Sequence, residues 1–390
     1  MALNNIPLFK VWMNPRAKEE VAKVVDSGYI GQGAKVDEFE DQLRQYLGVE
    51  HLVTLNSGTS GLHLALHMLK QSYAFADGYS SVQWPGLTSD DEVLTTSLTC
   101  TATNFPILAN GFNIKWVDLD PTTLNMDLDD LERKLSLRTK VIIAMYWGGY
   151  PLDLDRLQRI KKKCKDQFGF EPAIIQDCAH AMGSLYKNKS LATYGDLAMY
   201  SHQAIKHITS VDGGVLVVPP HLNKRARLLR WYGIDRDEKG RTDFRCEADI
   251  TEWGFKFHMN DVCATIGMTN LQDADYIVGA HKSNAKYYDA NLSGISGLTT
   301  LTRHPERDSA FWIYSMLVDD RPGFYRWMKE CNITVSQVHE RNDKHSGLQH
   351  FKTELPVLDR TIGKVVSIPV GWWVTEEQRE YIVDCIKKGW

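Results

Sequence analysis

Lys206 is the residue of this chain whose position most suggests covalent chemistry. It lies five residues after Ser201 and seven before the pair Gly213-Gly214, which opens an apolar segment. A lysine amine can form a Schiff base with an aldehyde. The alternative is a surface lysine in a turn before a strand, so other segments must decide between the two.

A second segment, Ser57-Gly58-Thr59-Ser60, lies between a short apolar strand expected at 53–55 and an apolar helix. Backbone amides at a helix N-terminus, together with two hydroxyl groups, make a phosphate site. Serine and threonine also cap helices for structural reasons alone. By itself this segment leaves both interpretations open.

Asp177 and His180 follow another apolar segment. An aspartate at the carboxyl end of a strand can hydrogen-bond a protonated pyridine nitrogen. His180 could reach the ring hydroxyl or stack on the ring. The structural alternatives are a helix cap for Asp177 and a satisfied, buried histidine for His180. The chain order of phosphate loop, aspartate and lysine, each at a strand end where ligands bind in α/β sheets, favours pyridoxal phosphate as a cofactor.

Strands and helices alternate through most of the chain, which predicts a doubly wound α/β fold. Past about residue 270 the pattern changes to helix, strand, helix and strand with more charge. We therefore expect a large domain over residues 1–270 and a small domain over 271–390. The expected strands are 53–55, 92–95, 114–117, 141–144, 173–176, 198–200 and 214–218, and the expected helices include 36–46, 129–134 and 154–165. Residues 71–90 show no helical period, and we expect an inserted loop there.

Composition excludes several classes of function. The chain has 390 residues and a net charge of −4, which gives no electrostatic case for nucleic acid or an anionic membrane. No run of about 18 apolar residues is present, so no membrane-spanning helix is expected, and the first ten residues do not resemble a signal peptide. Seven cysteines without a Cys-x-x-Cys pair suggest neither a disulfide framework nor a metal site, and they favour a reducing, cytoplasmic location.

Motifs spread along the chain resemble those of the DegT/DnrJ/EryC1/StrS sugar aminotransferases, which are fold-type I pyridoxal phosphate enzymes. The matching segments are GYIGQG at 28–33, NSGTSGLHLAL at 56–66, the blocks at 91–93, 102–104 and 117–121, DCAHAMG at 177–183, SHQAIKHITSVDGG at 201–214 and GFKFHMND at 254–261. The resemblance implies a large domain with a mostly parallel seven-stranded sheet flanked by helices, and a smaller C-terminal α+β domain.

The resemblance also implies roles for the catalytic residues. Lys206 would form the Schiff base and act as catalytic base, Asp177 would pair with the ring nitrogen, and His180 would lie near the ring oxygen. The residues implied at the phosphate are Gly58, Thr59, Ser60 and Ser201.

Two positions depart from the family pattern. Lys256 stands where the neighbouring subunit reaches the phosphate, commonly with an asparagine. Cys100 stands where an aromatic ring usually stacks on the cofactor. A small, soft side chain stacks less well, so another residue such as His180 would carry more of that contact.

The implied reaction moves an amino group from L-glutamate to a nucleotide-linked keto-sugar, with a 4-keto-6-deoxyhexose expected, in a homodimer with shared active sites. Gln32 in the turn 28–33, His339 and Arg341 are expected to contact the substrate, although a structural role for the last two is nearly as well supported. A 3-keto sugar is the nearest alternative substrate. A dehydratase, in which histidine replaces the lysine, and a non-catalytic cofactor-binding protein are disfavoured by Lys206 and Asp177.

Overall fold

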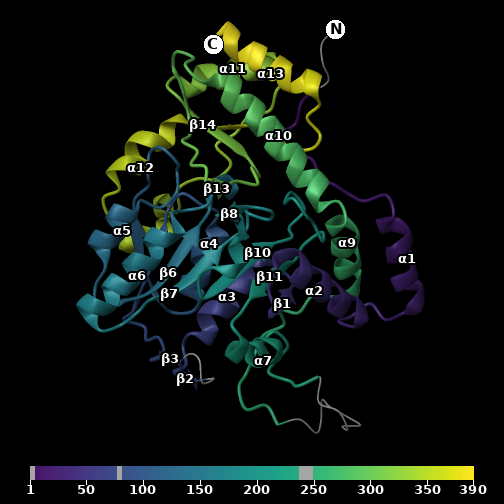
Figure 1. The fold of residues 1–390 in the computed structure, drawn as a ribbon, viewed down its shortest axis with the longest axis vertical. Coiled ribbons are helices and arrows are strands. Elements are labelled where there is room, and N and C mark those ends of the chain that lie inside the picture. The colour runs from purple at the N-terminus through teal and green to yellow at the C-terminus, as the bar shows by residue number, and fades with distance from the viewer. Residues whose placement is uncertain (1–4, 77–80, 237–248) are drawn as a thin grey trace.

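A seven-stranded sheet forms the centre of the molecule in the computed structural model, which describes residues 5–76, 81–236 and 249–390 (Figure 1). Its strand order is β1-β11-β10-β7-β6-β4-β5. β11 pairs antiparallel with both of its neighbours, and the other neighbouring pairs are parallel. The strands are β1 (Leu52–Leu55), β4 (Glu92–Thr96), β5 (Asn113–Val117), β6 (Thr139–Met145), β7 (Ala173–Asp177), β10 (Leu197–Ser201) and β11 (Gly214–Val217). The predicted mostly parallel α/β sheet is confirmed.

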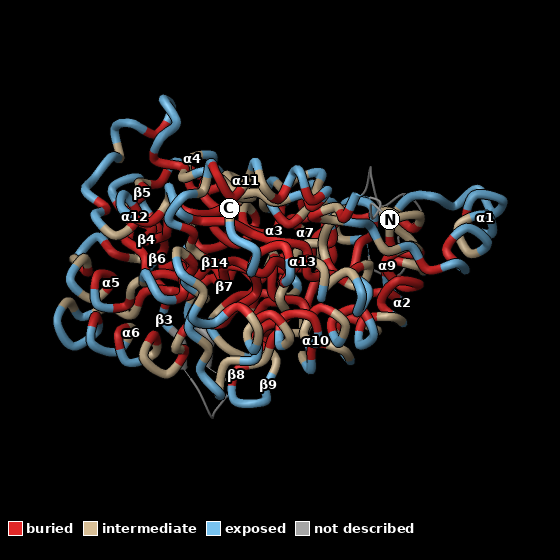
Figure 2. Tube along the Cα trace, turned by 90° about the horizontal axis from the view of Figure 1, so that it is seen from above, coloured by how far each residue is buried: buried red, intermediate tan, exposed pale blue. Residues whose placement is uncertain are grey.

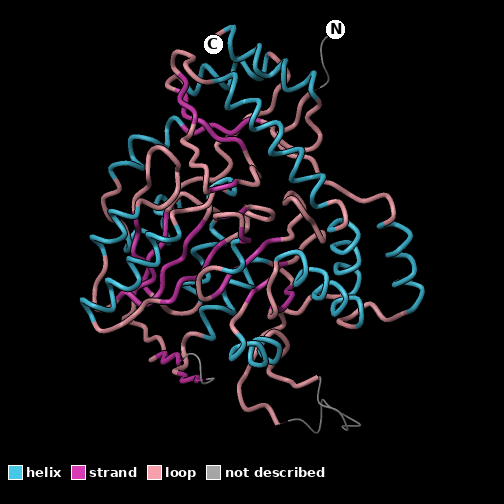
Figure 3. Tube along the Cα trace, viewed as in Figure 1, coloured by secondary structure: helices cyan, strands magenta, loops and turns pink. Residues whose placement is uncertain are grey.

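Helices cover both faces of this sheet, as Figure 3 shows. One face packs against α3 (Gly58–Met68), α4 (Thr101–Ala109) and α7 (Pro220–Leu229). The other packs against α2 (Ala34–Leu47), α5 (Leu128–Lys134), α6 (Leu154–Phe168) and α9 (Asp261–Leu271). Helix α6 extends past the expected end at residue 165, because Gly169 supplies the left-handed cap that ends it.

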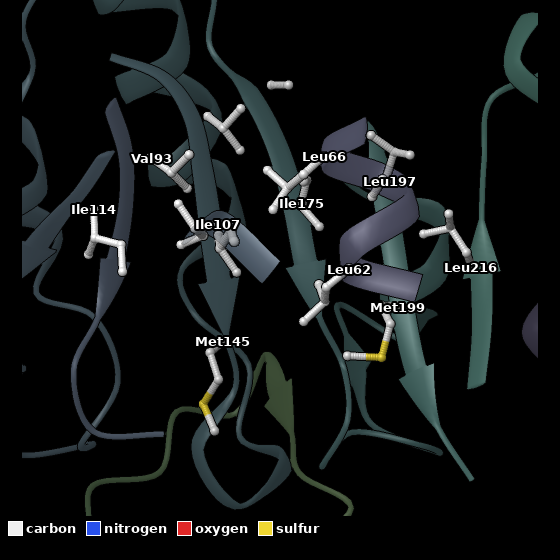
Figure 4. Packing of buried hydrophobic residues seen from close by; sticks show 14 of the residues in the cluster. Leu62, Leu66, Val93, Ile107, Ile114, Met145, Ile175, Leu197, Met199 and Leu216 are labelled. Carbon is white, nitrogen blue, oxygen red and sulfur yellow. The ribbon is translucent and has the colours of Figure 1, made fainter. Parts of the chain in front are cut away.

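The continuous apolar runs of the strands divide between the two faces, because successive side chains of a strand point in opposite directions. In β7, Ile175 joins the cluster under α3 and α4, whereas Ile174 joins the cluster under α2 and α6. Figure 4 shows Leu62 and Leu66 of α3 over Ile175 and Leu197. Burial is continuous through this central layer (Figure 2).

A second, three-stranded sheet in the order β12-β14-β15 lies at the end of the molecule that carries both termini (Figure 1). Its strands are β12 (Leu298–Thr300), β14 (Tyr314–Val318) and β15 (Val365–Ile368). Its apolar cluster draws on α10 (Ala274–Leu292), α11 (Arg321–Glu330) and α13 (Glu376–Lys388). All members except Ile6 follow residue 270, which supports our proposal of a separate domain over 271–390.

The remaining elements are short or peripheral. They are α1 (Ala17–Ser27), α12 (Pro356–Thr361), β8 (Leu185–Tyr186), β9 (Lys189–Ser190), β13 (Arg307–Asp308), and short 3-10 helices at Trp147–Gly149, Leu191–Thr193, Asn342–Lys344, Ser346–Phe351 and Ile362–Lys364. Throughout the ranges described, no helix combines the length and the apolar character needed to cross a bilayer.

The expectation of a loop without strands over residues 71–90 is wrong. β2 (Tyr73–Ala76) and β3 (Ser81–Trp84) pair antiparallel there. The indole of Trp84 is buried, donates a hydrogen bond from Nε1 to the Leu69 carbonyl (2.7 Å) and stacks on Tyr73. Packing of these aromatic rings against the body of the domain stabilises a hairpin that local composition did not reveal.

Candidate active site

A cavity of about 370 Å³ lies at the carboxyl ends of β7 and β10, beside the N-terminus of α3. This is the edge at which ligands bind in open α/β sheets. Of the residues predicted from the sequence, the structure brings to this cavity Gly58, Thr59, Cys100, Asp177, His180, Ser201, Lys206 and His339. It does not place Ser60, Lys256, Gln32 or Arg341 in the cavity lining.

The N-terminus of α3 forms one end of the cavity. Ser57 is its N-cap, with the side chain accepting a hydrogen bond from the Ser60 amide (3.1 Å). The first amides of a helix have no acceptor within the helix, and the helix dipole favours an anion there. Gly58 is needed for the close approach of β10, because a Cβ atom would lie 2.8 Å from the sulfur of Met199. Ser201 adds a hydroxyl from the end of β10, so this end suits a phosphate group.

Ser60 is part of the same turn but points elsewhere. Its hydroxyl donates to Asn56 Oδ1 (2.7 Å) and lies 2.9 Å from the hydroxyl of Ser57. The Ser60 side chain therefore stabilises the loop before α3 and does not line the cavity.

Asp177 is fixed at the end of β7 by two hydrogen bonds, one to each carboxylate oxygen. Thr103 donates from its hydroxyl to Oδ2 (2.7 Å), and the Ala179 amide donates to Oδ1 (3.0 Å). Burial raises the pKa of Asp177, and these hydrogen bonds and the charge of Lys206 oppose that rise. A cationic group within the cavity would favour the ionised carboxylate. The motif at 102–104 contains Thr103, but the local sequence does not indicate its role, because its partner Asp177 is distant in the chain.

Lys206 lies on the loop between β10 and β11 with its ammonium group in the cavity. Burial lowers the pKa of Lys206 to about 8, and Asp177 and Cys100 oppose that effect. A lysine with this pKa is partly neutral near neutral pH, so it can act as a nucleophile and as a base.

Aromatic rings form another part of the cavity wall. His180 stacks on Trp312, with centroids 3.8 Å apart and an angle of 23° between the planes. The ring of His339 is nearly parallel to that of His180, with the two centroids 5.5 Å apart. Burial lowers the pKa of His180 well below its usual value and that of His339 to about 4, so both are neutral. His180 Nδ1 and His339 Nε2 are buried and have no hydrogen-bond partner within the described ranges. A ligand in the cavity could satisfy both atoms.

The aromatic surface that could contact a cofactor ring does not come from position 100. Cys100 is the N-cap residue of α4 and lines the cavity with a small side chain. The aromatic surface comes instead from Trp312 and His180. Trp312 lies in an apolar segment just before β14, and nothing in the local sequence distinguishes it from a core tryptophan.

The other three predicted residues lie outside the cavity lining. The guanidinium group of Arg341 is bound by Asp343 (Nε to Oδ1, 2.7 Å) and by Asp359. Lys256 is exposed, with its ammonium group 5.6 Å from the ring of Tyr232. Gln32 accepts a hydrogen bond at its backbone carbonyl from Arg236 (3.1 Å).

The donor set fits pyridoxal phosphate: a helix N-terminus with hydroxyls for phosphate, a buried carboxylate for a cationic ring nitrogen, and a lysine of lowered pKa for the aldehyde. In the ranges that the structure describes, no cluster of His, Cys, Asp or Glu could hold a metal ion.

Comparison with known proteins agrees with this chemistry. Residues 13–387 match the model of the DegT/DnrJ/EryC1/StrS aminotransferase family. The crystal structure of AtS13 from Actinomadura melliaura is 46% identical, with 100% of each chain covered and a TM-score of 0.92. The sugar aminotransferase CalS13 from Micromonospora echinospora is 41% identical, with 99% of this chain and 100% of that chain covered and a TM-score of 0.91.

A curated relative is the UDP-4-amino-4-deoxy-L-arabinose–oxoglutarate aminotransferase of Shewanella sediminis. It is 28% identical, with 84% of this chain and 81% of that protein covered. From the family match over nearly the whole chain and the cavity that suits the family's cofactor, we conclude that this chain belongs to the DegT/DnrJ/EryC1/StrS aminotransferase family and is a pyridoxal phosphate-dependent sugar aminotransferase.

Proposed function

We propose that this enzyme transfers an amino group from L-glutamate to a nucleotide-linked keto-sugar, and that the sugar is a 4-keto-6-deoxyhexose. The observation that carries the proposal is the placement of Lys206 and Asp177 in one cavity with a phosphate-binding helix end. Support for the donor and for a nucleotide sugar comes from the Shewanella relative, whose name specifies oxoglutarate and a UDP-linked 4-amino sugar.

Bound pyridoxal phosphate supplies an electron sink that stabilises negative charge on a substrate carbon. Asp177 would hold its ring nitrogen, and Gly58, Thr59 and Ser201 would hold its phosphate. Lys206 would accept and return the proton at the substrate carbon. Its pKa of about 8 suits this exchange, because a base works best with a pKa near the working pH.

We propose that His339 contacts the sugar substrate through its free Nε2 atom. The adjacent Arg341 has both sides of its guanidinium group engaged by carboxylates. Its contribution to substrate binding would therefore be to order the loop that carries His339.

We further propose a homodimer with shared active sites, in which Lys256 reaches the phosphate of the partner and Gln32 reaches its nucleotide. The backbone at Lys256 is tied to the phosphate loop, since its carbonyl accepts a hydrogen bond from Asn56 Nδ2 (3.2 Å), while its side chain is exposed. Two large apolar side chains are also exposed: Trp253, three residues before Lys256, by 65%, and Tyr29, in the turn that carries Gln32, by 83%. Exposed apolar side chains of this size suit a protein interface.

The substrate assignment is tested by separate half-reactions. L-Glutamate should convert the bound cofactor of the purified enzyme to its aminated form, as measured by the cofactor absorbance. The aminated enzyme should then aminate nucleotide-linked 4-keto-6-deoxyhexoses, as measured by mass spectrometry of the sugar. Lys206→Ala should bind cofactor without turnover. Amination of 3-keto sugars alone would support the alternative substrate, and failure with every keto-sugar in a panel of nucleotides would contradict the proposal.

The support of Asp177 by Thr103 predicts a specific loss of cofactor affinity. Thr103→Val removes the hydroxyl that stabilises the charged carboxylate, a hydrogen bond worth about 1.5 kcal/mol or more. Titration of cofactor-free enzyme with pyridoxal phosphate should show roughly tenfold weaker binding. Thr101→Val, in the same helix but outside the cavity lining, is the matched control. Equal affinities of the two variants would rule out the assigned role of Thr103.

The shared-site proposal predicts complementation between subunits. Lys206→Ala and Lys256→Ala should each have little activity, yet a refolded mixture should recover part of it, because one site of a mixed dimer inherits both defects and the other is whole. The control is a mixture of Lys206→Ala with Asp177→Asn. These residues line the same cavity of one chain, so every site of that mixed dimer carries a defect and stays inactive. A fully active monomer, or no recovery in the first mixture, would refute the proposal.

A further inference from the structure

We propose that Trp312 is a positioning residue for Lys206: its indole ring holds the lysine ammonium group at the wall of the cavity and sets the orientation of the His180 ring. The inference rests on the proposed role of Lys206 in the transfer reaction. It assigns a function to a residue that sequence motifs did not single out.

Trp312 lies close to both Lys206 and His180. Lys206 Nζ lies 3.7 Å from the centroid of the Trp312 ring, and the His180 centroid lies 3.8 Å from it. The Trp312 side chain is only 2% exposed. An indole face attracts a cation, and the attraction is stronger where water is excluded. The ring therefore favours the charged form of Lys206 in surroundings that otherwise disfavour it.

Trp312 is tied directly to the loop that carries the lysine. Its Nε1 donates to the carbonyl of Ile205 (2.8 Å), the residue before Lys206. Its backbone amide donates to the carbonyl of Gly148 (3.0 Å) in the turn after β6. The indole thus spans the segment before β14 and the lysine loop, and movement of either would change the distance between ring and ammonium group.

Two buried histidines hold the chain immediately before Trp312. His207 Nε2 donates to the carbonyl of Ala310 (3.0 Å), and His281 Nδ1 donates to the carbonyl of Phe311 (2.8 Å). Phe311 has a φ of 50°, a left-handed conformation that is rare for a bulky residue and persists only where surrounding contacts enforce it. The histidines supply such contacts, so the position of the indole is built into the fold.

Two acidic groups and three histidines interact electrostatically with Lys206. Burial lowers the pKa of Lys206, and Asp177 and Cys100 raise it. His180, His207 and His339 are neutral, because burial lowers the pKa of each and the charge of Lys206 lowers it further. Removal of the indole therefore changes the cation–aromatic contact without removing a charge.

The direction in which the pKa of Lys206 changes on replacement of Trp312 distinguishes two roles. In one, the ring attracts the ammonium group; in the other, it only excludes water. Trp312→Leu keeps an apolar side chain and loses the aromatic face, so the pKa of Lys206 should fall. If the ring only excluded water, the smaller leucine would admit water and the pKa would rise. The expected fall is about 0.5 to 1 pH unit, from the strength of a desolvated cation–aromatic contact.

The experiment measures the pH dependence of Lys206 acetylation by trace acetic anhydride, read by peptide mass spectrometry, on full-length enzyme freed of pyridoxal phosphate. Trp312→Leu should move the midpoint down, and Trp312→Phe should move it less, because phenylalanine attracts a cation more weakly than tryptophan. Trp327→Phe, whose ring lies on α11, is the control and should leave it unchanged. An unchanged or raised midpoint in the two Trp312 variants overturns the proposal, and the phenylalanine variant suffices if the leucine variant does not fold.

A double-mutant cycle tests whether His281 acts on Lys206 by holding the backbone next to Trp312. His281→Gln should shift the Lys206 midpoint in the same direction, and should add little when Trp312 is already leucine, because it acts through the indole. Fully additive shifts would contradict this. The acetylation midpoint of Lys206 does not depend on turnover. If the wild-type enzyme aminates keto-sugars but the Trp312 variants leave the midpoint unshifted, the role of Trp312 alone is refuted. If the variants shift the midpoint but the wild-type enzyme aminates no keto-sugar, the proposed function alone is refuted.

Discussion

The burial of a carboxylate and an amine in one cavity is the constraint on which this structure depends. Removing either charge from water is unfavourable, and each group responds as an isolated ion would: the pKa of Asp177 is raised and that of Lys206 is lowered. Their mutual attraction offsets part of that cost. A cationic pyridine ring would pair with Asp177, and an aldehyde would react with the neutral amine of Lys206, so the two groups suit the cofactor that the family uses.

The fold supplies this arrangement through strand ends and helix ends that lie at one edge of the sheet. Parallel pairing of β7 and β10 brings Asp177 and Ser201 to the same edge, and α3 directs its free amides toward that edge. Residues of the C-terminal part complete the cavity, since Trp312 and His339 follow residue 270. The active site therefore depends on how the two sheets of the molecule are held together, and the hydrogen bond from Trp312 to Ile205 is one of the contacts that join them.

The sequence predicted the parts of the site that local pattern encodes. Apolar runs located all seven strands of the large sheet, and the residues just after them included Asp177, Lys206 and the phosphate loop. Contacts between distant segments were not predictable in this way. His339 and Arg341 are two residues apart, yet one lines the cavity and the other binds carboxylates. Trp312 resembles a core residue because its function depends on a neighbour more than a hundred positions away, and the β2–β3 hairpin was missed because packing, more than composition, stabilises it.

We propose that Lys206 is the lysine to which pyridoxal phosphate becomes attached, and this attachment can be measured directly. Borohydride reduction of the enzyme as purified fixes the cofactor to its lysine, and digestion followed by mass spectrometry locates the added mass. We expect a single labelled peptide that contains Lys206, and we expect no label in a Lys206→Arg variant. A label at Lys256 or at any other lysine, with Lys206 unmodified, would contradict it.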